Sequence, residues 1–581
     1  MNKKVFDFHR IQINEHVLMV LLAILVGLAG GFGAVGFRYL INFIQTLSYG
    51  SENELLNTIQ TIPLHYRIWV PAAGGLVIGP MIYFWAREAK GHGVPEVMEA
   101  VALRGGLIRK RVVFIKTLAS AICIGTGGSV GREGPIVQIG SAIGSAIGQL
   151  LKVSAERMRT LVGCGAAAGI AATFNAPIAG SMFALEIILG DFGLKNFSPI
   201  VIASVVATAI SRHFLGDTPA FIVPAYELVS TWELPLYVVM GLFCAAVGVG
   251  FTLILYRAED LFAKFRFPEY LKPVVGGFIL GIAALFLPHI LGVGYGTIDL
   301  VWVHKLSWWL MLVLILGKIL STSVTIGSGG SGGIFAPSLF IGAMAGGFFG
   351  TIVHTLFPSM TAAPGAYSLV GMGAVVSATT HGPMTAILML FEMTGDYKII
   401  LPLMVVCIIS TLFSGKLSKE SIYTFKLVRR GVDLRGGKEV NVLKSMAVKD
   451  VMNTNIETIP KNLSLAKMAA KISRSKYNSF PVIDAQNKLC GMLSFKDYKD
   501  ALFDESLKDL VLATDIATAE VLTITDDSDL YTALQTISRK DFSTLPVVSP
   551  DDPKRLVGVV TRRDIIGAYE KAVIKKTLFA K

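Results

Sequence analysis

The chain has 581 residues, 53% of them hydrophobic and 16% charged, and its net charge at pH 7 is +12. Soluble globular proteins carry about 25% charged residues, so this composition excludes an ordinary soluble enzyme and a disordered chain. The charges are unevenly placed: residues 1–415 hold 25 Lys/Arg and 20 Asp/Glu, whereas the much shorter remainder holds 28 and 21. We therefore expect a membrane domain followed by a soluble domain, with the basic excess marking the cytoplasmic side of the membrane and no nucleic-acid partner.

Apolar runs in the first part predict membrane-spanning helices, which need about 20 apolar residues each. No small-residue cleavage site follows the first run, so we expect residues 1–15 to remain in the cytoplasm. Because an unsatisfied backbone group in lipid costs several kcal/mol, interrupted helices at membrane depth indicate a transport pathway. The clear spans are residues 17–37, 68–85, 235–255, 308–320 and 399–413, and the shorter runs interrupted by Gly or Pro include 136–150, 161–173 and 338–350.

An internal repeat strengthens this interpretation. Residues 125–148 align without gaps to residues 327–350 at an offset of 202, with ten of 24 positions identical and a lysine nine residues upstream of each segment. A second match, at an offset of 206, joins residues 174–186 to residues 380–392, and each of these segments ends in a glutamate. Paired segments interrupted by Gly and Pro in two halves of a chain are typical of a transporter binding site.

The repeated segments carry Gly-Pro motifs that predict helix starts. Residues 131–135 (GREGP) and 333–337 (GIFAP) hold twin positions, and residues 91–95 (GHGVP) form a third such start. Pro is favoured in the first turn of a helix, Gly lets the backbone approach a ligand closely, and a helix N-terminus offers free N–H groups and about half a positive charge. Gly-Pro clusters usually mark loops only, but the duplication favours helix starts that bind an anion.

Glu133 lies in the first of these motifs, and a carboxylate in an apolar domain is a functional candidate. It would compete with an anion for the same N–H groups, and protonation would release it, so we expect a gate that responds to pH. The alternative is a carboxylate neutralised by Arg132 or Lys116. Glu186 and Glu392 hold twin positions, and we expect backbone N–H groups to satisfy their carboxylates.

The soluble part predicts two similar α/β units, at residues 441–498 and 507–569. Each has an upstream strand, at 479–483 or 544–548. Each then ends in a buried strand, a turn and a helix start with the pattern G-h-h-[ST]-x-x-D, where h is a hydrophobic residue.

The three Gly-Pro motifs, followed by Tyr423, resemble those of the CLC family of chloride channels and chloride/proton antiporters, and the tail resembles a CBS pair. The resemblance implies an all-α polytopic membrane protein with inverted repeats, followed by a cytoplasmic α/β CBS-pair domain. The implied parts are a cytoplasmic N-terminus (1–15), a CLC-like transmembrane anion-transport domain (16–430, with repeats at about 16–215 and 233–430), a linker (431–440), CBS 1 (441–506), CBS 2 (507–572) and a basic tail (573–581).

The resemblance also implies roles for single residues. Glu133 would be the external gate. The amides of Ile334 and Phe335 and the hydroxyl of Tyr423 would hold a central anion, and the amides around Glu133 would hold an outer anion once the gate swings away. The implied anion-binding residues are His92, Gly93, Arg132, Gly134, Ile334, Phe335 and Tyr423.

Two positions depart from the family pattern. His92 stands where the family often has Ser. Its imidazole N–H can donate to an anion, or the ring can turn away so that the backbone alone binds the anion. A preference for fluoride or nitrate therefore stays open. Ile187 stands where antiporters of the family commonly carry an inner glutamate. An inner proton relay is then missing, or is served by water, Glu186 or another group. This favours a channel-like or weakly proton-coupled transporter, with an H⁺/Cl⁻ antiporter as the alternative.

The resemblance further implies partners and location. These are a homodimer with one pathway per subunit, chloride or another small anion, protons where transport is coupled, and membrane lipid. The location is the plasma membrane of a bacterium or archaeon, with both termini cytoplasmic. No metal or obligatory cofactor is expected, but the CBS pair can take an adenine nucleotide (ATP, ADP or AMP), which would be held by Ser494, Asp497, Thr561 and Asp564.

Two rival classes of protein fit parts of the sequence. Residues 127–131 formally fit the G-x-S-x-G pattern of a serine hydrolase, but the same Gly-Ser-Gly spacing recurs at 329–333, which favours structural glycine over an intramembrane protease. A CBS-bearing cation transporter would need clustered carboxylates in the membrane, and the membrane part has few. We therefore expect a transporter and no enzyme.

Overall fold

The computed structural model describes most of the chain. The described residues are 15–51, 55–217, 221, 223, 229–303, 305–432, 443–444, 446–475, 477–494, 497, 510–539 and 543–578, with side chains up to 571. Two compact units emerge, the first ending at Arg429 and the second beginning at Arg430. The expectations for residues 1–14 and for most of the linker lie outside the described residues, as does the end of the basic tail.

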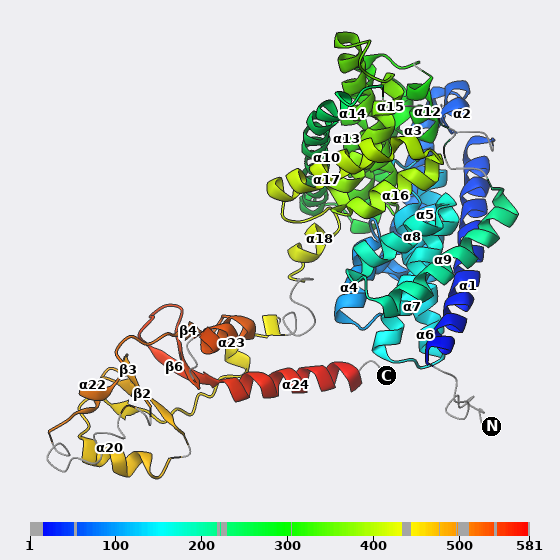
Figure 1. Ribbon diagram of the computed structural model, residues 1–581. Helices are drawn as coiled ribbons and strands as arrows, with labels where there is room; N and C mark the ends of the chain where they lie inside the picture. Colours follow the sequence, from blue (N-terminus) through cyan, green and yellow to red (C-terminus); the bar gives the residue numbers. More distant parts are fainter. Residues whose placement is uncertain are drawn as a thin grey trace, which may run out of the picture. The chain divides into compact units, whose positions relative to one another are not determined.

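The first unit is a bundle of helices (Figure 1). In the part of the chain that the structure describes, eight helical segments are long and apolar enough to cross a membrane. The main helices are α1 (Glu15–Tyr49), α2 (Leu55–Thr61), α3 (Leu64–Trp85), α4 (Val94–Leu103), α5 (Arg111–Gly125), α6 (Glu133–Leu150), α7 (Ala155–Phe174), α8 (Pro177–Phe183), α9 (Leu194–Leu215), α10 (Glu233–Lys264), α11 (Lys272–Phe286), α12 (Tyr295–Trp302), α13 (Trp308–Gly327), α14 (Phe335–Leu356), α15 (Pro364–Thr380), α16 (Pro383–Thr394), α17 (Ile400–Leu417) and α18 (Thr424–Arg429).

All five predicted spans lie in helices long enough to cross a membrane: α1, α3, α10, α13 and α17. The prediction that residues 338–350 form a short, interrupted run is wrong, because they lie inside α14, which continues for 22 residues. Gly342, Gly346 and Gly350 do not break α14. Instead they let α15 approach, and a Cβ on Gly346 would lie 2.1 Å from the carbonyl oxygen of Tyr367.

The two halves of this unit are related by a local two-fold axis. Gly131 and Gly333 are twins at the offset of 202, and they form an antiparallel bridge in which each donates its N–H to the other's carbonyl, at 2.8 and 2.6 Å. The repeat also includes α3 and α11, whose relation to each other was not apparent from the sequence. A Cβ on Gly75 of α3 would meet the carbonyl of Pro273 at 2.3 Å, and a Cβ on its twin Gly277 of α11 would meet the carbonyl of Pro71, also at 2.3 Å.

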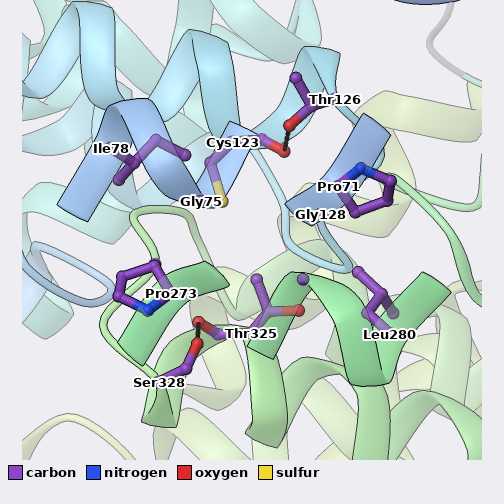
Figure 2. Close-up of a pocket in the computed structure, with 12 residues that line it drawn as sticks. Pro71, Gly75, Ile78, Cys123, Thr126, Gly128, Pro273, Leu280, Thr325 and Ser328 are labelled. Carbon is purple, nitrogen blue, oxygen red and sulfur yellow. Dashed lines mark hydrogen bonds between the residues drawn. The ribbon is translucent and has the colours of Figure 1, made fainter. Parts of the chain in front are cut away.

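A small pocket lies on this axis (Figure 2). Thr126 donates to the carbonyl of Cys123, and the twin residue Ser328 donates to the carbonyl of Thr325 on the opposite side of the pocket. Its twelve lining residues form six twin pairs, each at the offset of 202: Pro71/Pro273, Gly75/Gly277, Ile78/Leu280, Cys123/Thr325, Thr126/Ser328 and Gly128/Gly330.

The shift of the offset from 202 to 206 has a plain structural cause. α6 has 18 residues and α14 has 22, so the second half gains about one helical turn before the chain enters the next helix. The packing after this turn is the same in both halves. Gly140 and Gly165 approach each other's carbonyls across α6 and α7, and Gly342 and Gly371 do so across α14 and α15.

The second unit contains two three-stranded sheets with identical topology. In each sheet the first strand pairs parallel to the second, the second pairs antiparallel to the third, and the register shifts near the end of the second strand. The predicted upstream strands at 479–483 and 544–548 are confirmed as β2 and β5. The elements are η7 (Val448–Asp450), β1 (Ile459–Pro460), α20 (Leu465–Ile472), β2 (Ser479–Ile483), β3 (Leu489–Ser494), α22 (Ala513–Ile516), β4 (Ile524–Thr525), α23 (Leu530–Arg539), β5 (Thr544–Val548), β6 (Leu556–Thr561) and α24 (Arg562–Leu578).

Candidate functional site

Backbone hydrogen bonds bring the three Gly-Pro motifs together. Gly131 and Gly333 exchange two hydrogen bonds, and Gly91 donates its N–H to the carbonyl of Gly330 at 3.0 Å. The helix starts follow at once: α4 begins at Val94, α6 at Glu133 and α14 at Phe335. Three segments that lie far apart in the sequence therefore place their helix N-termini around one buried point.

Glycine makes this approach possible. A Cβ on Gly134 would lie 2.1 Å from the carbonyl oxygen of His92 and 3.1 Å from the Cα of Gly333. Gly93 precedes α4 with φ of 84°, a conformation that residues with a side chain rarely adopt. Since the first N–H groups of a helix have no partner within the helix, the converging starts offer donors to an anion. The Nε of Arg132 adds a donor, because it is buried and has no hydrogen-bond partner in the part of the chain that the structure describes.

Glu133 occupies this donor cluster with its own carboxylate and is 1% exposed. Its Oε2 accepts from the N–H of Ala336 in the twin motif, and its Oε1 accepts from the hydroxyl of Tyr295, both at 3.3 Å. These hydrogen bonds are longer than the usual 2.7–3.2 Å, so the carboxylate is held without a strong partner. Among the described residues, neither Arg132 nor Lys116 forms an ion pair with it, although Arg132 lies near enough to interact with it electrostatically. The gating role of Glu133 and its alternative, a carboxylate neutralised by a neighbouring cation, both stay predictions.

Lys116 and Lys318, the twin lysines, have a different role. The Nζ of Lys116 donates to the carbonyls of Ala89 and Gly91, at 3.0 and 2.7 Å. The Nζ of Lys318 donates to the carbonyls of Ile290 and Gly292, at 3.1 and 2.7 Å. Each lysine therefore holds a glycine turn that precedes a helix start, α4 in the first half and α12 in the second.

His92 is fully buried at the centre of the cluster. Its ring lies 5.8 Å from the ring of Tyr423, and its Nε2 lies 3.4 Å from the hydroxyl of Tyr256 on α10. That hydroxyl donates to the carbonyl of Ile422, next to Tyr423, at 2.5 Å. The structure therefore joins the first motif to Tyr423 through aromatic side chains, and the anion-binding role of these residues stays a prediction.

Glu186 and Glu392 are satisfied by backbone N–H groups, as expected from their twin positions in the sequence. Glu186 accepts from the N–H groups of Met384 and Thr385 at the start of α16, at 3.2 and 2.7 Å. Glu392 accepts from the N–H groups of Ile178 and Ala179 at the start of α8, at 3.0 and 2.7 Å. Each half thus supplies the carboxylate that caps a helix of the other half, and a role for Glu186 in proton transfer stays a prediction.

The G-x-S-x-G serine is engaged in packing between the two halves. The Oγ of Ser129 lies 3.0 Å from that of Ser321, and its twin Ser331 lies 2.9 Å from the Oγ of Ser120. Ser129 also lies 3.4 Å from the Oγ1 of Thr322, the twin of Ser120, so this contact repeats across the two-fold axis. The contacts join the halves of the bundle and give Ser129 no catalytic partner among the described residues.

In the second unit, the predicted nucleotide residues form two matching contacts between a Ser or Thr and an Asp, and the second of these lies at the start of α24. Asp497 accepts from the N–H and the hydroxyl of Ser494, at 2.7 and 2.6 Å. Asp564 accepts from the N–H and the hydroxyl of Thr561, at 3.0 and 2.6 Å. The two copies therefore share one local geometry, and a ribose hydroxyl would have to share these oxygens or displace these contacts.

Sequence reasoning missed two groups at the site, Tyr295 and the amide of Ala336. Both contact Glu133, which makes them its immediate environment. A signal for Tyr295 was present: residues 292–295 repeat the Gly-x-Gly spacing of residues 91–94 at an offset of 201. That segment lacks the following proline, so the search for Gly-Pro motifs does not find it.

Comparison with known proteins agrees with this geometry. Residues 74–415 match the family model of the voltage-gated chloride channel, and residues 448–504 and 513–571 match the CBS domain. A ClcB-like protein of Ralstonia nicotianae is 35% identical over 419 residues, which are 71% of this chain and 98% of that protein. The H⁺/Cl⁻ exchange transporter ClcA of Vibrio cholerae is 31% identical over 420 residues, or 71% of this chain and 89% of that protein.

A solved structure, that of a slow cyanobacterial Cl⁻/H⁺ antiporter, superimposes with a TM-score of 0.65 and 28% sequence identity. The match covers 72% of this chain and 99% of the antiporter. The repeated helix starts around Glu133 and the two tail units thus have counterparts in one known group of proteins: the chain belongs to the CLC family of chloride channels and antiporters, and it carries a C-terminal pair of CBS domains.

Proposed function

We propose that this multi-pass membrane protein moves chloride through the cluster of helix starts, with Glu133 as the gate, and that transport is uncoupled from protons or only weakly coupled to them. The observation that carries the proposal is the position of the Glu133 carboxylate, which accepts the N–H of Ala336 in the twin motif. An anion needs such donors, because Born desolvation would otherwise cost tens of kcal/mol in a low-dielectric site. Carboxylate and anion therefore exclude each other.

The proposal predicts the behaviour of Glu133→Gln in liposomes that contain the full chain. Glutamine is neutral at every pH, so anion flux is retained while its pH dependence and any proton movement are lost. The measurement is chloride efflux with and without a proton gradient, over a range of pH. Glu392→Gln is the matched control, since that carboxylate binds amides of α8 and its change should leave the pH dependence intact. An unchanged pH response in Glu133→Gln would show that Glu133 is no gate.

Proton coupling is the second question. Ile187 is buried and cannot carry a proton, and Glu186 beside it is engaged by α16. This supports channel-like or weakly coupled transport. The alternative is full exchange, which is the activity named for the Vibrio cholerae relative and for the cyanobacterial structure. Reversal potentials under opposed chloride and proton gradients decide between them: the chloride Nernst value indicates a channel, and a displaced value indicates exchange.

We also propose that the protein forms homodimers with one pathway per subunit, in a bacterial or archaeal plasma membrane with both termini in the cytoplasm. Mass photometry of the purified full chain tests the dimer, and protease accessibility of the tail in right-side-out vesicles tests the orientation. An adenine nucleotide at the CBS pair would then act from the cytoplasm, because CBS domains commonly bind such nucleotides.

A further inference from the structure

Tyr295 is the one side chain that donates a hydrogen bond to the carboxylate of Glu133 in the described residues. Its hydroxyl donates to Oε1 at 3.3 Å, while the amide of Ala336 donates to Oε2. Besides the backbone N–H of Glu133 itself, the carboxylate thus has these two donors, one on each oxygen, and neither hydrogen bond is short. A group held by weak hydrogen bonds is fixed in one position yet can leave it at a modest cost in free energy.

The local backbone places Tyr295 firmly. Gly292 and Gly294 have φ of 61° and 93° and form the turn that precedes α12. Lys318 holds this turn by donating to the carbonyls of Ile290 and Gly292. A Cβ on Gly294 would lie 2.7 Å from the ring of Phe340, so α14 fixes the turn from its other side. Tyr295 is the first residue of α12 and directly follows this turn, so the same contacts hold its backbone in place.

The ring of Tyr295 is also fixed by its neighbours. Phe221 meets it edge to face, with ring centroids 5.1 Å apart and an interplanar angle of 77°. The guanidinium of Arg132 lies 5.7 Å from the ring centroid, within cation–π distance. These contacts involve the ring alone, so the hydroxyl is left with Glu133 as its partner.

The two-fold axis gives an independent argument. The twin of Glu133 is Phe335, and the twin of Tyr295, by the offset of 201 at the glycine turn, is Val94. Glu133 of the first half and Tyr295 of the second half therefore pair a carboxylate with a hydroxyl donor, while their twins, Phe335 and Val94, are both apolar. The donor and the carboxylate depart from the symmetry together, as expected if they work as a pair.

We propose that Tyr295 is a positioning residue that holds the Glu133 carboxylate in the closed state of the anion pathway. The proposal rests on the role of Glu133 as the gate. Loss of the hydroxyl removes one of its donors and weakens the closed state, so more of the molecules are open at any moment. Tyr295→Phe removes the hydroxyl and keeps the ring contacts with Phe221 and Arg132.

The experiment measures chloride efflux from liposomes at one fixed neutral pH, using the full chain. Tyr295→Phe should raise the efflux rate by about two- to tenfold, the range expected for the loss of one hydrogen bond. In the Glu133→Ala background the same change should have no effect, because the group that Tyr295 positions is gone. This dependence on Glu133 is a readout that a merely structural tyrosine would not give.

Tyr367→Phe is the matched control. Tyr367 is also a buried tyrosine that donates to a carboxylate, that of Glu233 at 2.9 Å, and its loss should leave efflux unchanged. Thermal unfolding of each purified variant shows that it is folded. The proposal is overturned if Tyr295→Phe leaves the rate unchanged, or changes it equally in the native and the Glu133→Ala backgrounds. If Glu133→Ala alone alters neither rate nor pH response, the gate itself is refuted, and the positioning role falls with it.

Discussion

At the scale of single residues, His92 is the side chain that most sets this chain apart. It is fully buried between the Gly-Pro motifs and the ring of Tyr423, and its Nε2 faces the hydroxyl of Tyr256. A hydroxyl at this position, as the family often has, would present a shorter donor. The imidazole presents a larger ring with a nitrogen donor.

We expect His92→Ala to raise the half-saturating chloride concentration by about ten- to a hundredfold, because a hydrogen bond to a charged group contributes roughly 1.5–3 kcal/mol. Chloride-dependent flux and isothermal titration measure the effect. His354→Ala is the control, since His354 lies on α14 and bonds to Thr361. If His92→Ala leaves chloride affinity and the order of chloride, nitrate and fluoride unchanged, the ring faces away from the pathway and the backbone alone binds the anion.

The sequence identified Glu133 and His92 because each is unusual within its own motif. It could not identify Tyr295 or the amide of Ala336 as partners of the carboxylate. These contacts arise only when the twin motifs fold against each other across 162 and 203 residues. The sequence pattern shows which residues have suitable chemistry, but the packing of the folded chain determines which of them are in contact.

At the scale of elements, the exchange of Glu186 and Glu392 ties the two halves together. A carboxylate at a helix N-terminus is typically worth 0.3–1 kcal/mol and about 2 kcal/mol when partly buried. Glu186→Gln and Glu392→Gln should therefore each lower the free energy of unfolding by about 1–2 kcal/mol, seen as a lower midpoint in thermal unfolding. Glu186→Gln should cost the more of the two, because Glu186 also accepts from the hydroxyl of Thr385 at 2.6 Å, whereas Glu392 binds backbone N–H groups alone.

Substitutions of Glu186 and Glu392 also distinguish a structural role of Glu186 from a role in proton transfer. If Glu186 also carries protons, Glu186→Gln reduces proton flux relative to chloride flux and Glu392→Gln does not. Equal ratios in both variants would restrict Glu186 to its capping role.

The helices themselves were predictable to differing degrees. Long uniform runs such as those in α1 and α10 were found, because hydropathy alone identifies them. α9 and α11 were missed, since α9 contains Pro199 and several polar residues and α11 has only 15 residues after a short 3₁₀ turn. The glycines of α14 suggested interruption, whereas their function is close contact with α15.

At the scale of the whole molecule, the tail holds two matching pairs, Ser494/Asp497 and Thr561/Asp564, as the predicted nucleotide-binding positions. Asp497 and Asp564 each accept from a hydroxyl and a backbone N–H three residues upstream. We expect the full chain to bind ATP, ADP or AMP, and Asp564→Ala to weaken that binding at least tenfold, as the loss of a charge-assisted hydrogen bond implies. Chloride flux without nucleotide should be unaffected.

Isothermal titration with each nucleotide measures this binding. Asp529→Ala is the control, because Asp529 caps α23 through Thr532 and is not part of the repeated G-h-h-[ST]-x-x-D pattern. If the unmodified chain binds none of the three nucleotides, the proposed nucleotide role of the CBS pair is wrong.

The mutual hydrogen bonds of Gly131 and Gly333 have an evolutionary consequence. A methyl group on Gly131 would lie 1.9 Å from the Glu133 carboxylate, and one on Gly333 would lie 2.9 Å from the same oxygen. Only one copy carries the acidic group, since the twin of Glu133 is Phe335, yet both copies must leave room for it. The two copies therefore cannot change independently at these glycines. A larger residue at Gly333, in the copy without the acid, would displace the Glu133 carboxylate of the other copy.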